Sequence, residues 1–293
     1  YGPVGFTPGT GTIINSVNNP FVVTGLTPST SYEFYVRDSC GAGSVSVWVG
    51  SVDVRTRCAP SVAPYTEDFD GPLWILGTGV TNNNNAIDPC WLRTPGASTG
   101  GNSLFSWGSR TGGTPSVGTG PDAGNGGSGN YVYIEASGGG TGDRAYLETP
   151  LIDLSPLTNP ELEFSYHMFG TDIDSLVVEV NDGSGFTQIG GISGAQQTAN
   201  NDPWLPLTLS LNAYVGDTIS IRLYSQKVGF AGDIAIDDLE VREAAACPAP
   251  FGITVSTAGS NFIQLNWTSG GAANAQIEYG PVGFTPGSGT VVN

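Results

Sequence analysis

Apolar and polar residues follow strand-like patterns in short segments along the chain. Residues 175–180 (SLVVEV) and 218–223 (TISIRL) are β-branched runs, and residues 205–211 (LPLTLSL) and 262–267 (FIQLNW) alternate between apolar and polar. Such segments place one side of a strand on a core and the other side in solvent. Gly or Pro interrupts almost every window long enough for a helix. The pattern predicts an all-β protein, in which Pro206 marks an edge strand or a strand start.

Composition narrows the functional classes. The 293 residues suit two domains of roughly 100–200 residues each. The net charge is −17, from 26 acidic and 9 basic residues, and Lys227 is the single lysine. Such a surface repels phosphate backbones, so we exclude nucleic-acid binding through a basic groove. No apolar run approaches the ~18 residues of a membrane span, so we expect no membrane insertion.

A long repeat organises the chain. Residues 1–9 read YGPVGFTPG, and residues 279–287 read YGPVGFTPG again. The match continues as GTGTIIN against GSGTVVN, so residue 279 corresponds to residue 1 and the period is 278 residues. A period far above the roughly 20–50 residues of solenoid repeats indicates tandem whole domains. We expect the chain to be one period of a longer array plus a short overlap.

Reading across the repeat junction restores a second kind of domain. Residues 244–293 contribute a strand with Trp267, and residues 1–58 contribute the segment GLTPSTSYEFYVR around Tyr32. Joined, they resemble a fibronectin type III domain, an immunoglobulin-like sandwich in which a Tyr at the start of a strand bonds back to upstream backbone. The resemblance implies that residues 1–58 are the C-terminal part of one such domain and residues 244–293 the N-terminal part of the next.

The central residues 59–243 resemble the MAM domain of meprins, receptor phosphatases and neuropilins. The resemblance rests on motifs that occur in the family's order: DFD at 68–70, a Gly-rich loop, GNYVY at 129–133, AYLETP at 145–150, LEFSYHMFG at 162–170 and GDIAIDDL at 232–239. It implies a jelly-roll-like antiparallel sandwich that alternates with the fibronectin type III sandwich. Animal MAM domains usually hold internal disulfides, whereas Cys90 is the only cysteine in this segment.

The four cysteines suit an extracellular array in which disulfides persist. Four cysteines allow three pairings. In a fibronectin-type sandwich Cys247 would begin the first strand, and Cys40 of the following copy would lie at the same pole. The resemblance therefore implies one disulfide between Cys247 and the Cys40 equivalent of the next copy, and another between Cys58 and Cys90. No CxxC pair favours a metal–thiolate site.

Four aspartates are candidate calcium ligands: Asp70, Asp122, Asp143 and Asp237. The MAM resemblance brings them together, and family members often carry a cation where the first strand, the Gly-rich loop and the final strand converge. Calcium takes about 6–8 oxygens, which loop-borne Asp beside Gly-rich backbone can supply. The alternative is that Asp122 and Asp143 are solvated loop acids and that Asp237 is a buried hydrogen-bond acceptor.

Little in the sequence points to catalysis. His167 is the single histidine and lies in an apolar strand, where a packed side chain is the commoner role, and no GxSxG nucleophile motif occurs. We expect a non-enzymatic protein. Trp107 and Trp204 lie in loop-like contexts and are candidate glycan contacts, although core packing is the favoured explanation for each ring.

These observations predict a structural and adhesive function. Alternating MAM and fibronectin type III modules in near-identical copies resemble the repeat-containing surface adhesins of Bacteroidetes. We expect a secreted or cell-surface segment that assembles head to tail with neighbouring copies of the same repeat, and that contacts glycans or surface proteins. The alternative is a glycan-binding accessory region of a secreted hydrolase.

Overall fold

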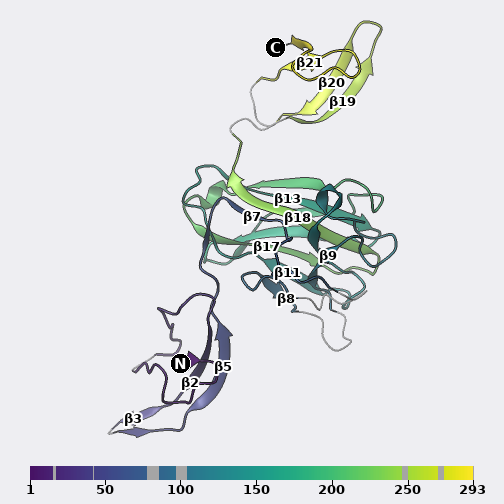
Figure 1. The fold of residues 1–293 in the computed structure, drawn as a ribbon. Helices are drawn as coiled ribbons and strands as arrows, with labels where there is room; N and C mark the ends of the chain where they lie inside the picture. Colours follow the sequence, from purple (N-terminus) through teal and green to yellow (C-terminus); the bar gives the residue numbers. More distant parts are fainter. Residues whose placement is uncertain are drawn as a thin grey trace. The chain divides into compact units, whose positions relative to one another are not determined.

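The computed structural model describes residues 1–15, 18–41, 43–77, 86–96, 104–245, 250–269 and 274–292 (Figure 1). The chain divides into two compact units, Tyr1–Arg242 and Glu243–Asn293. Two short 3-10 helices, η1 (Asn125–Gly127) and η2 (Asn212–Tyr214), are the only helices in the described part of the chain. All other regular elements there are strands, so the predicted all-β class is confirmed.

The first unit contains a sandwich of two sheets. The first sheet has the strand order β16-β13-β18-β10-β9, and β7 pairs with the far end of β18. Its strands are β7 (Tyr65–Glu67), β9 (Trp107–Thr111), β10 (Asn130–Ile134), β13 (Pro160–Gly170), β16 (Leu205–Ser210) and β18 (Gly232–Glu243). Pro206 lies on β16, the terminal strand of this order, which confirms its predicted edge position.

The second sheet has the order β15-β14-β17-β11-β8, and the short strands β12 and β6 extend it beside β17. Its strands are β6 (Ser61–Val62), β8 (Leu92–Thr94), β11 (Arg144–Glu148), β12 (Ile152–Asp153), β14 (Ser175–Asn181), β15 (Phe186–Ser193) and β17 (Thr218–Gln226). All its pairings are antiparallel except β12 with β6.

The two sheets pack face to face around one core. Leu162 and Phe164 of the first sheet and Val178, Ile221 and Leu223 of the second are fully buried in the same cluster. Every second side chain of β14 is buried and the ones between are half-buried, as the period of two predicts. Burial of a side chain of this size contributes roughly 1.5–3 kcal/mol, so this cluster is the main source of the sandwich's stability.

Shorter sheets precede and follow the sandwich in the sequence. The N-terminal piece pairs β1 (Gly2–Pro3), β2 (Ser31–Val36) and β5 (Val49–Arg55), beside a small ribbon of β3 (Ser39–Gly41) and β4 (Ser44–Val45). The second unit contains the pair β19 (Phe251–Ala258) and β20 (Ile263–Thr268) and the pair β21 (Ile277–Tyr279) and β22 (Thr290–Val292). At the start of β2, the backbone N–H of Thr27 donates to the Tyr32 hydroxyl at 3.0 Å, the bond that the fibronectin resemblance implies.

Candidate functional site

The repeated sequence folds into the same hairpin at both of its positions. The backbones of Tyr1 and Thr12 exchange two hydrogen bonds of 2.8 Å each. Tyr279 pairs with Thr290 in the β21–β22 ladder, which is the same pairing shifted by 278 residues. Because sequence and register both recur, residues 1–12 and 279–290 form the same local hairpin.

The turn inside each hairpin also recurs. The N–H of Phe6 donates to the carbonyl of Pro3 at 3.1 Å, and the N–H of Phe284 donates to the carbonyl of Pro281 at 3.0 Å. In each copy the aromatic ring lies against the glycine that follows the first tyrosine, Gly2 or Gly280, so closely that a Cβ there would collide with it. The segment therefore forms this hairpin whichever flanking strands accompany it.

Both flanking sheets expose apolar side chains. All seven residues of β5 and all eight of β19 are exposed. Val52 of β5 is 63% exposed, Ile253 of β19 is 69% exposed, and Trp267 of β20 is 37% exposed. Strands of a soluble sandwich normally bury alternate side chains against a second layer. Each flanking piece thus presents strands that lack a covering layer among the described residues.

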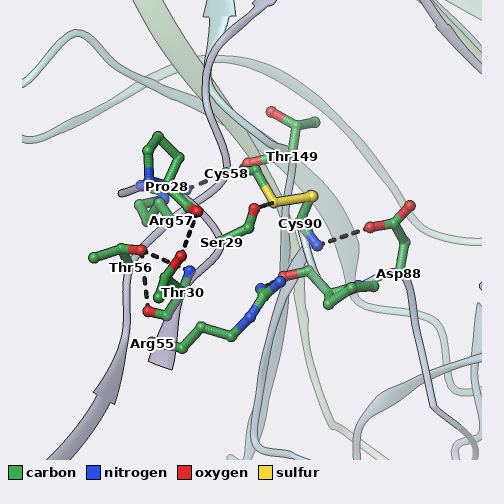
Figure 2. The surroundings of a disulfide bond; sticks show 11 residues. Pro28, Ser29, Thr30, Arg55, Thr56, Arg57, Cys58, Asp88, Cys90 and Thr149 are labelled. Atoms are coloured by element: carbon green, nitrogen blue, oxygen red, sulfur yellow. Dashed lines mark hydrogen bonds between the residues drawn. A yellow bond between two sulfur atoms is a disulfide. The ribbon is translucent and has the colours of Figure 1, made fainter. Parts of the chain in front are cut away.

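A disulfide joins the N-terminal piece to the sandwich. Cys58 and Cys90 are bonded, with their Cα atoms 5.4 Å apart, as predicted. Figure 2 shows Arg55, Arg57 and Asp88 beside this bond. Arg57 pairs with Glu148 at 2.8 Å, and Arg55 donates to the carbonyl of Pro89 at 3.0 Å. Together with the parallel β6–β12 pairing, these contacts tie the end of β5 to the second sheet.

The other predicted disulfide has only one of its two cysteines among the described residues. Cys40 is exposed and unbonded, and it lies in β3. Cys247, its predicted partner in a neighbouring copy, lies outside the described residues.

Two of the four predicted calcium ligands lie near each other. One carboxylate oxygen of Asp237 accepts the N–H of Asn125 at 2.9 Å, and a carboxylate oxygen of Asp70 accepts the N–H of Asn130 at 2.6 Å. The pKa of Asp237 is raised to about 7, mainly by burial and also by the charges of Asp238 and Asp70, against the opposing effect of its backbone hydrogen bonds. The end of the first strand, the Gly-rich loop and the final strand therefore converge here.

The other two predicted ligands lie elsewhere. Asp143 precedes β11 of the second sheet, and its carboxylate caps the N–H of Gly140 at 2.8 Å. Asp122 bonds through its backbone N–H to the carbonyl of Asn200 at 3.1 Å. Within the described segments no three His, Cys, Asp or Glu side chains are placed to hold one metal ion. The four predicted aspartates therefore do not come together at one site among the described residues.

Asp70 and Asp237 nevertheless fit a cation in charge and donor type. Neither carboxylate takes part in any of the ion pairs among the described residues, although Asp237 is 4% exposed and Asp238 follows it. A buried carboxylate without a basic partner is costly to ionise, and a bound cation would offset that cost. Further oxygen ligands would have to come from amide and backbone carbonyl groups.

Trp107 is a core residue, which agrees with the favoured explanation and rules out its candidate role as a glycan contact. Its side chain is 0% exposed, and the indole N–H donates to the carbonyl of Ala145 at 3.2 Å. The Gly-rich flanks suggested a loop, whereas the residue begins β9 and faces the core. Trp204 is half-buried, packs on Tyr131 at 5.6 Å between ring centroids, and donates its indole N–H to the carbonyl of Ala123.

His167 is packed inside β13. The ring is 0% exposed and lies 5.8 Å from the Trp204 ring and 6.5 Å from the Phe169 ring. Burial lowers the pKa of this imidazole to about 4, so it is neutral at physiological pH. This environment is that of a packed side chain, the role that the sequence favours.

Comparison with known families is decisive for the central sandwich. The profile of the MAM domain, meprin/A5/mu, matches residues 96–248, slightly more than half of the 293-residue chain. The chain belongs to the MAM domain family. Neuropilin-1a of Danio rerio is 30% identical to it over 142 residues, which cover 47% of this chain and 15% of that protein. The chain therefore spans only a small part of that relative's length.

Similarity to solved structures is weak for this MAM chain. The K1 cleaved adhesin domain of Lys-gingipain from Porphyromonas gingivalis W83 is 18% identical, with a TM-score of 0.40, and the match covers 62% of this chain and 99% of that domain. TmCBM61 in complex with beta-1,4-galactotriose is 14% identical, with a TM-score of 0.28, over 40% of this chain and 72% of that one.

No helix among the described residues is long and apolar enough to cross a bilayer.

One feature of the MAM sandwich is not evident from the sequence alone. Tyr146 and Tyr224 lie directly opposite each other on β11 and β17, and both are half-buried on the outer face of the second sheet. Their neighbours in sequence, Leu147 and Leu223, point into the core. Period-two alternation could have placed each tyrosine outside. The pairing itself depends on the register between strands 78 positions apart.

Proposed function

We propose that this chain is a structural and adhesive repeat segment of an extracellular fibre or surface adhesin, whose copies join head to tail. In this proposal residues 1–58 and 244–293 are two parts of a fibronectin type III-like domain, and residues 59–243 are the MAM sandwich between them. The observation that carries the proposal is the recurrence of one hairpin in both flanking pieces. A neighbouring copy, covalent or separate, can therefore supply the strands that each piece lacks.

The exposed apolar residues give this joining a driving force. Covering side chains such as Val52, Ile253 and Trp267 contributes roughly 1.5–3 kcal/mol for each one that becomes fully buried. A head-to-tail contact uses different surfaces of the two copies and does not close on itself, so repetition generates a filament. The Cys58–Cys90 bond supports an extracellular location, because disulfides persist in oxidising compartments.

A non-catalytic role is part of the proposal. The single histidine, His167, is fully buried and neutral, which removes the usual general base from solvent. The alternative function is a glycan-binding accessory region of a secreted hydrolase; of its two candidate tryptophan contacts, the Trp107 ring is fully buried.

A tandem chain tests the head-to-tail proposal. Residues 1–278 are placed directly before a full second copy, so that β19 and β20 of the first copy precede β2 and β5 of the second. Trp267 of the first copy should then become buried, whereas Trp267 of the second copy keeps the 37% exposure of the single chain. Iodide quenching of Trp267→Phe variants, made in one copy or the other, reports each ring separately.

Stability measurements give the matched control for the tandem chain. Trp267→Ala in the first copy should destabilise the junction by about 3–5 kcal/mol, the usual cost of removing a buried large ring. The same substitution in the second copy should have almost no effect. Equal quenching and equal stability for the two copies would show that the flanking pieces do not complete each other.

We also propose that calcium binds beside Asp70 and Asp237. Millimolar calcium should raise the melting temperature of the MAM sandwich, because a ligand at about 100 times its dissociation constant stabilises by about 2.7 kcal/mol. Asp237→Asn should remove the calcium effect, and Asp217→Asn, at an exposed turn, should preserve it. A melting temperature that changes with neither calcium nor chelator would contradict this site.

A further inference from the structure

The outer face of the second sheet carries an aromatic pair. Tyr146 of β11 and Tyr224 of β17 are directly opposite cross-strand neighbours, with ring centroids 5.2 Å apart and ring planes tilted by 40°. Both side chains are half-buried, and the sandwich core lies on the opposite side of the sheet. Cross-strand pairs of this kind form a continuous apolar surface that solvent reaches from one side.

Arg222 is fixed beside this pair. Its guanidinium lies 4.8 Å from the Tyr146 centroid and 3.5 Å from the Phe186 centroid, and it pairs with Glu179 at 2.5 Å. Glu179 lies directly opposite Arg222 in the β14–β17 register. Both charges are thus satisfied within the protein, and this arginine holds the surface in shape.

Arg144 differs from Arg222 in its partners. It is exposed at the other side of the pair, where its guanidinium carbon lies 5.7 Å from the Tyr224 centroid. Its Nε–H donates to the neutral side-chain amide of Gln226 at 3.0 Å. Arg144 takes part in none of the ion pairs found among the described residues.

The arginines around the tyrosine pair distinguish this face from the acidic chain as a whole. The whole chain has a net charge of −17 and nine basic residues. On the outer face, Arg57 pairs with Glu148 and Arg222 pairs with Glu179, whereas Arg144 is in no ion pair among the described residues and is attracted by Glu179 only at longer range. A guanidinium has five N–H donors in a planar fork that matches a carboxylate, and the hydrogen bonds of Arg144 go to neutral partners, the Gln226 amide and the Tyr146 side chain. We call Tyr146, Tyr224, Arg144 and Gln226 the tyrosine–arginine face.

We propose that the tyrosine–arginine face binds an acidic polysaccharide. The C–H side of a sugar ring packs on Tyr146 and Tyr224, and the carboxylate of a uronic acid pairs with Arg144, while Gln226 donates to a neighbouring hydroxyl. This ligand matches both properties of the face, an apolar aromatic pair and a guanidinium that takes part in no ion pair among the described residues. The site goes beyond the proposed head-to-tail function, since it lies on the MAM sandwich and uses none of the flanking strands.

Binding of polygalacturonate to the full chain tests the proposal, with a neutral β-1,4-galactan as the comparison ligand. Isothermal titration at fixed ionic strength should show binding of polygalacturonate and none of the galactan. Arg144→Gln should weaken binding at least tenfold. Arg37→Gln is the matched control, because Arg37 also lies over an aromatic ring, 4.3 Å from the Trp48 centroid in the N-terminal piece, and its loss changes the net charge equally. It should change affinity less than twofold.

A second variant separates recognition from general electrostatics. Tyr224→Leu keeps an apolar side chain on β17 and should also weaken binding at least tenfold, with the melting temperature confirming the fold. Arg144→Gln is an exposed substitution and stays informative even if Tyr224→Leu is unstable. Absence of polygalacturonate binding, equal losses in Arg144→Gln and Arg37→Gln, or undiminished binding in Arg144→Gln would each overturn the proposal. A negative result in the tandem-chain test would not affect the proposal that this face binds an acidic polysaccharide.

Discussion

Replacing Cys58 and Cys90 together by Ser removes the bond between the N-terminal piece and the sandwich. The disulfide closes a loop with a sequence separation of 32 residues, and this loop contains β6, β7 and the buried rings of Phe69 and Trp74. Without the bond the unfolded chain gains the conformations that ring closure excludes. The loop-entropy relation for 32 residues gives a loss of about 3.7 kcal/mol in the free energy of unfolding at 25 °C.

Urea-induced unfolding of the whole chain measures this loss. Fluorescence follows the sandwich directly, because Trp74, Trp91 and Trp107 are all buried in its core. Wild-type protein in reducing agent should match the double variant, since both lack the same bond. Cys40→Ser is the matched control: Cys40 is exposed and unbonded, so its replacement should change the free energy of unfolding by less than about 0.5 kcal/mol.

A loss below about 1 kcal/mol in the double variant would refute this reasoning. It would mean that the loop from 58 to 90 is already constrained in the unfolded chain, or that it unfolds separately from the core. The fluorescence transition and a far-ultraviolet circular dichroism transition should coincide if loop and core unfold together.

Two further predictions concern buried side chains of the MAM sandwich. The pKa of Asp237 is raised from 3.8 in the unfolded chain to about 7 in the folded protein, so the folded state binds this proton more tightly. The free energy of unfolding should therefore fall as the pH rises from about 4 to 7. In thermal melts with chelator present, Asp237→Asn should flatten that slope. An unchanged slope would assign the pH dependence to other groups. Trp107→Ala should cost about 3–5 kcal/mol in urea unfolding, while Val117→Ala, fully exposed in the Gly-rich loop, should cost almost nothing.

Local patterns predicted the strands of the sandwich well. The runs at 175–180 and 218–223 lie within β14 and β17, and the alternating segment at 205–211 became the edge strand that Pro206 suggested. These segments succeed because β-branched composition and period-two alternation act within a few neighbouring residues. The tyrosine bond at Tyr32 was predictable for the same reason, since its partner Thr27 is five residues away.

Sites proved harder to predict than strands. Asp143 and Asp237 are both acids beside Gly-rich or strand segments, yet one precedes β11 of the second sheet and the other lies in β18 of the first. Trp107 has glycines and serines around it, which suggested a loop, but its strand pairs with β10 and turns the ring into the core. In each case the misplacement came from how a strand is paired, a feature that its own residues do not encode.

The sequence by itself determined the all-β class, the 278-residue repeat, the family and the Cys58–Cys90 pairing, because these depend on local periodicity, on identity between distant segments and on a family motif order. Only the tertiary structure decided which carboxylates meet, which tryptophan is buried, and that Tyr146 stands opposite Tyr224. The physical reason is cross-strand register. A shift of one residue between two strands exchanges their inner and outer faces, and that register is set by core packing between strands far apart in the chain.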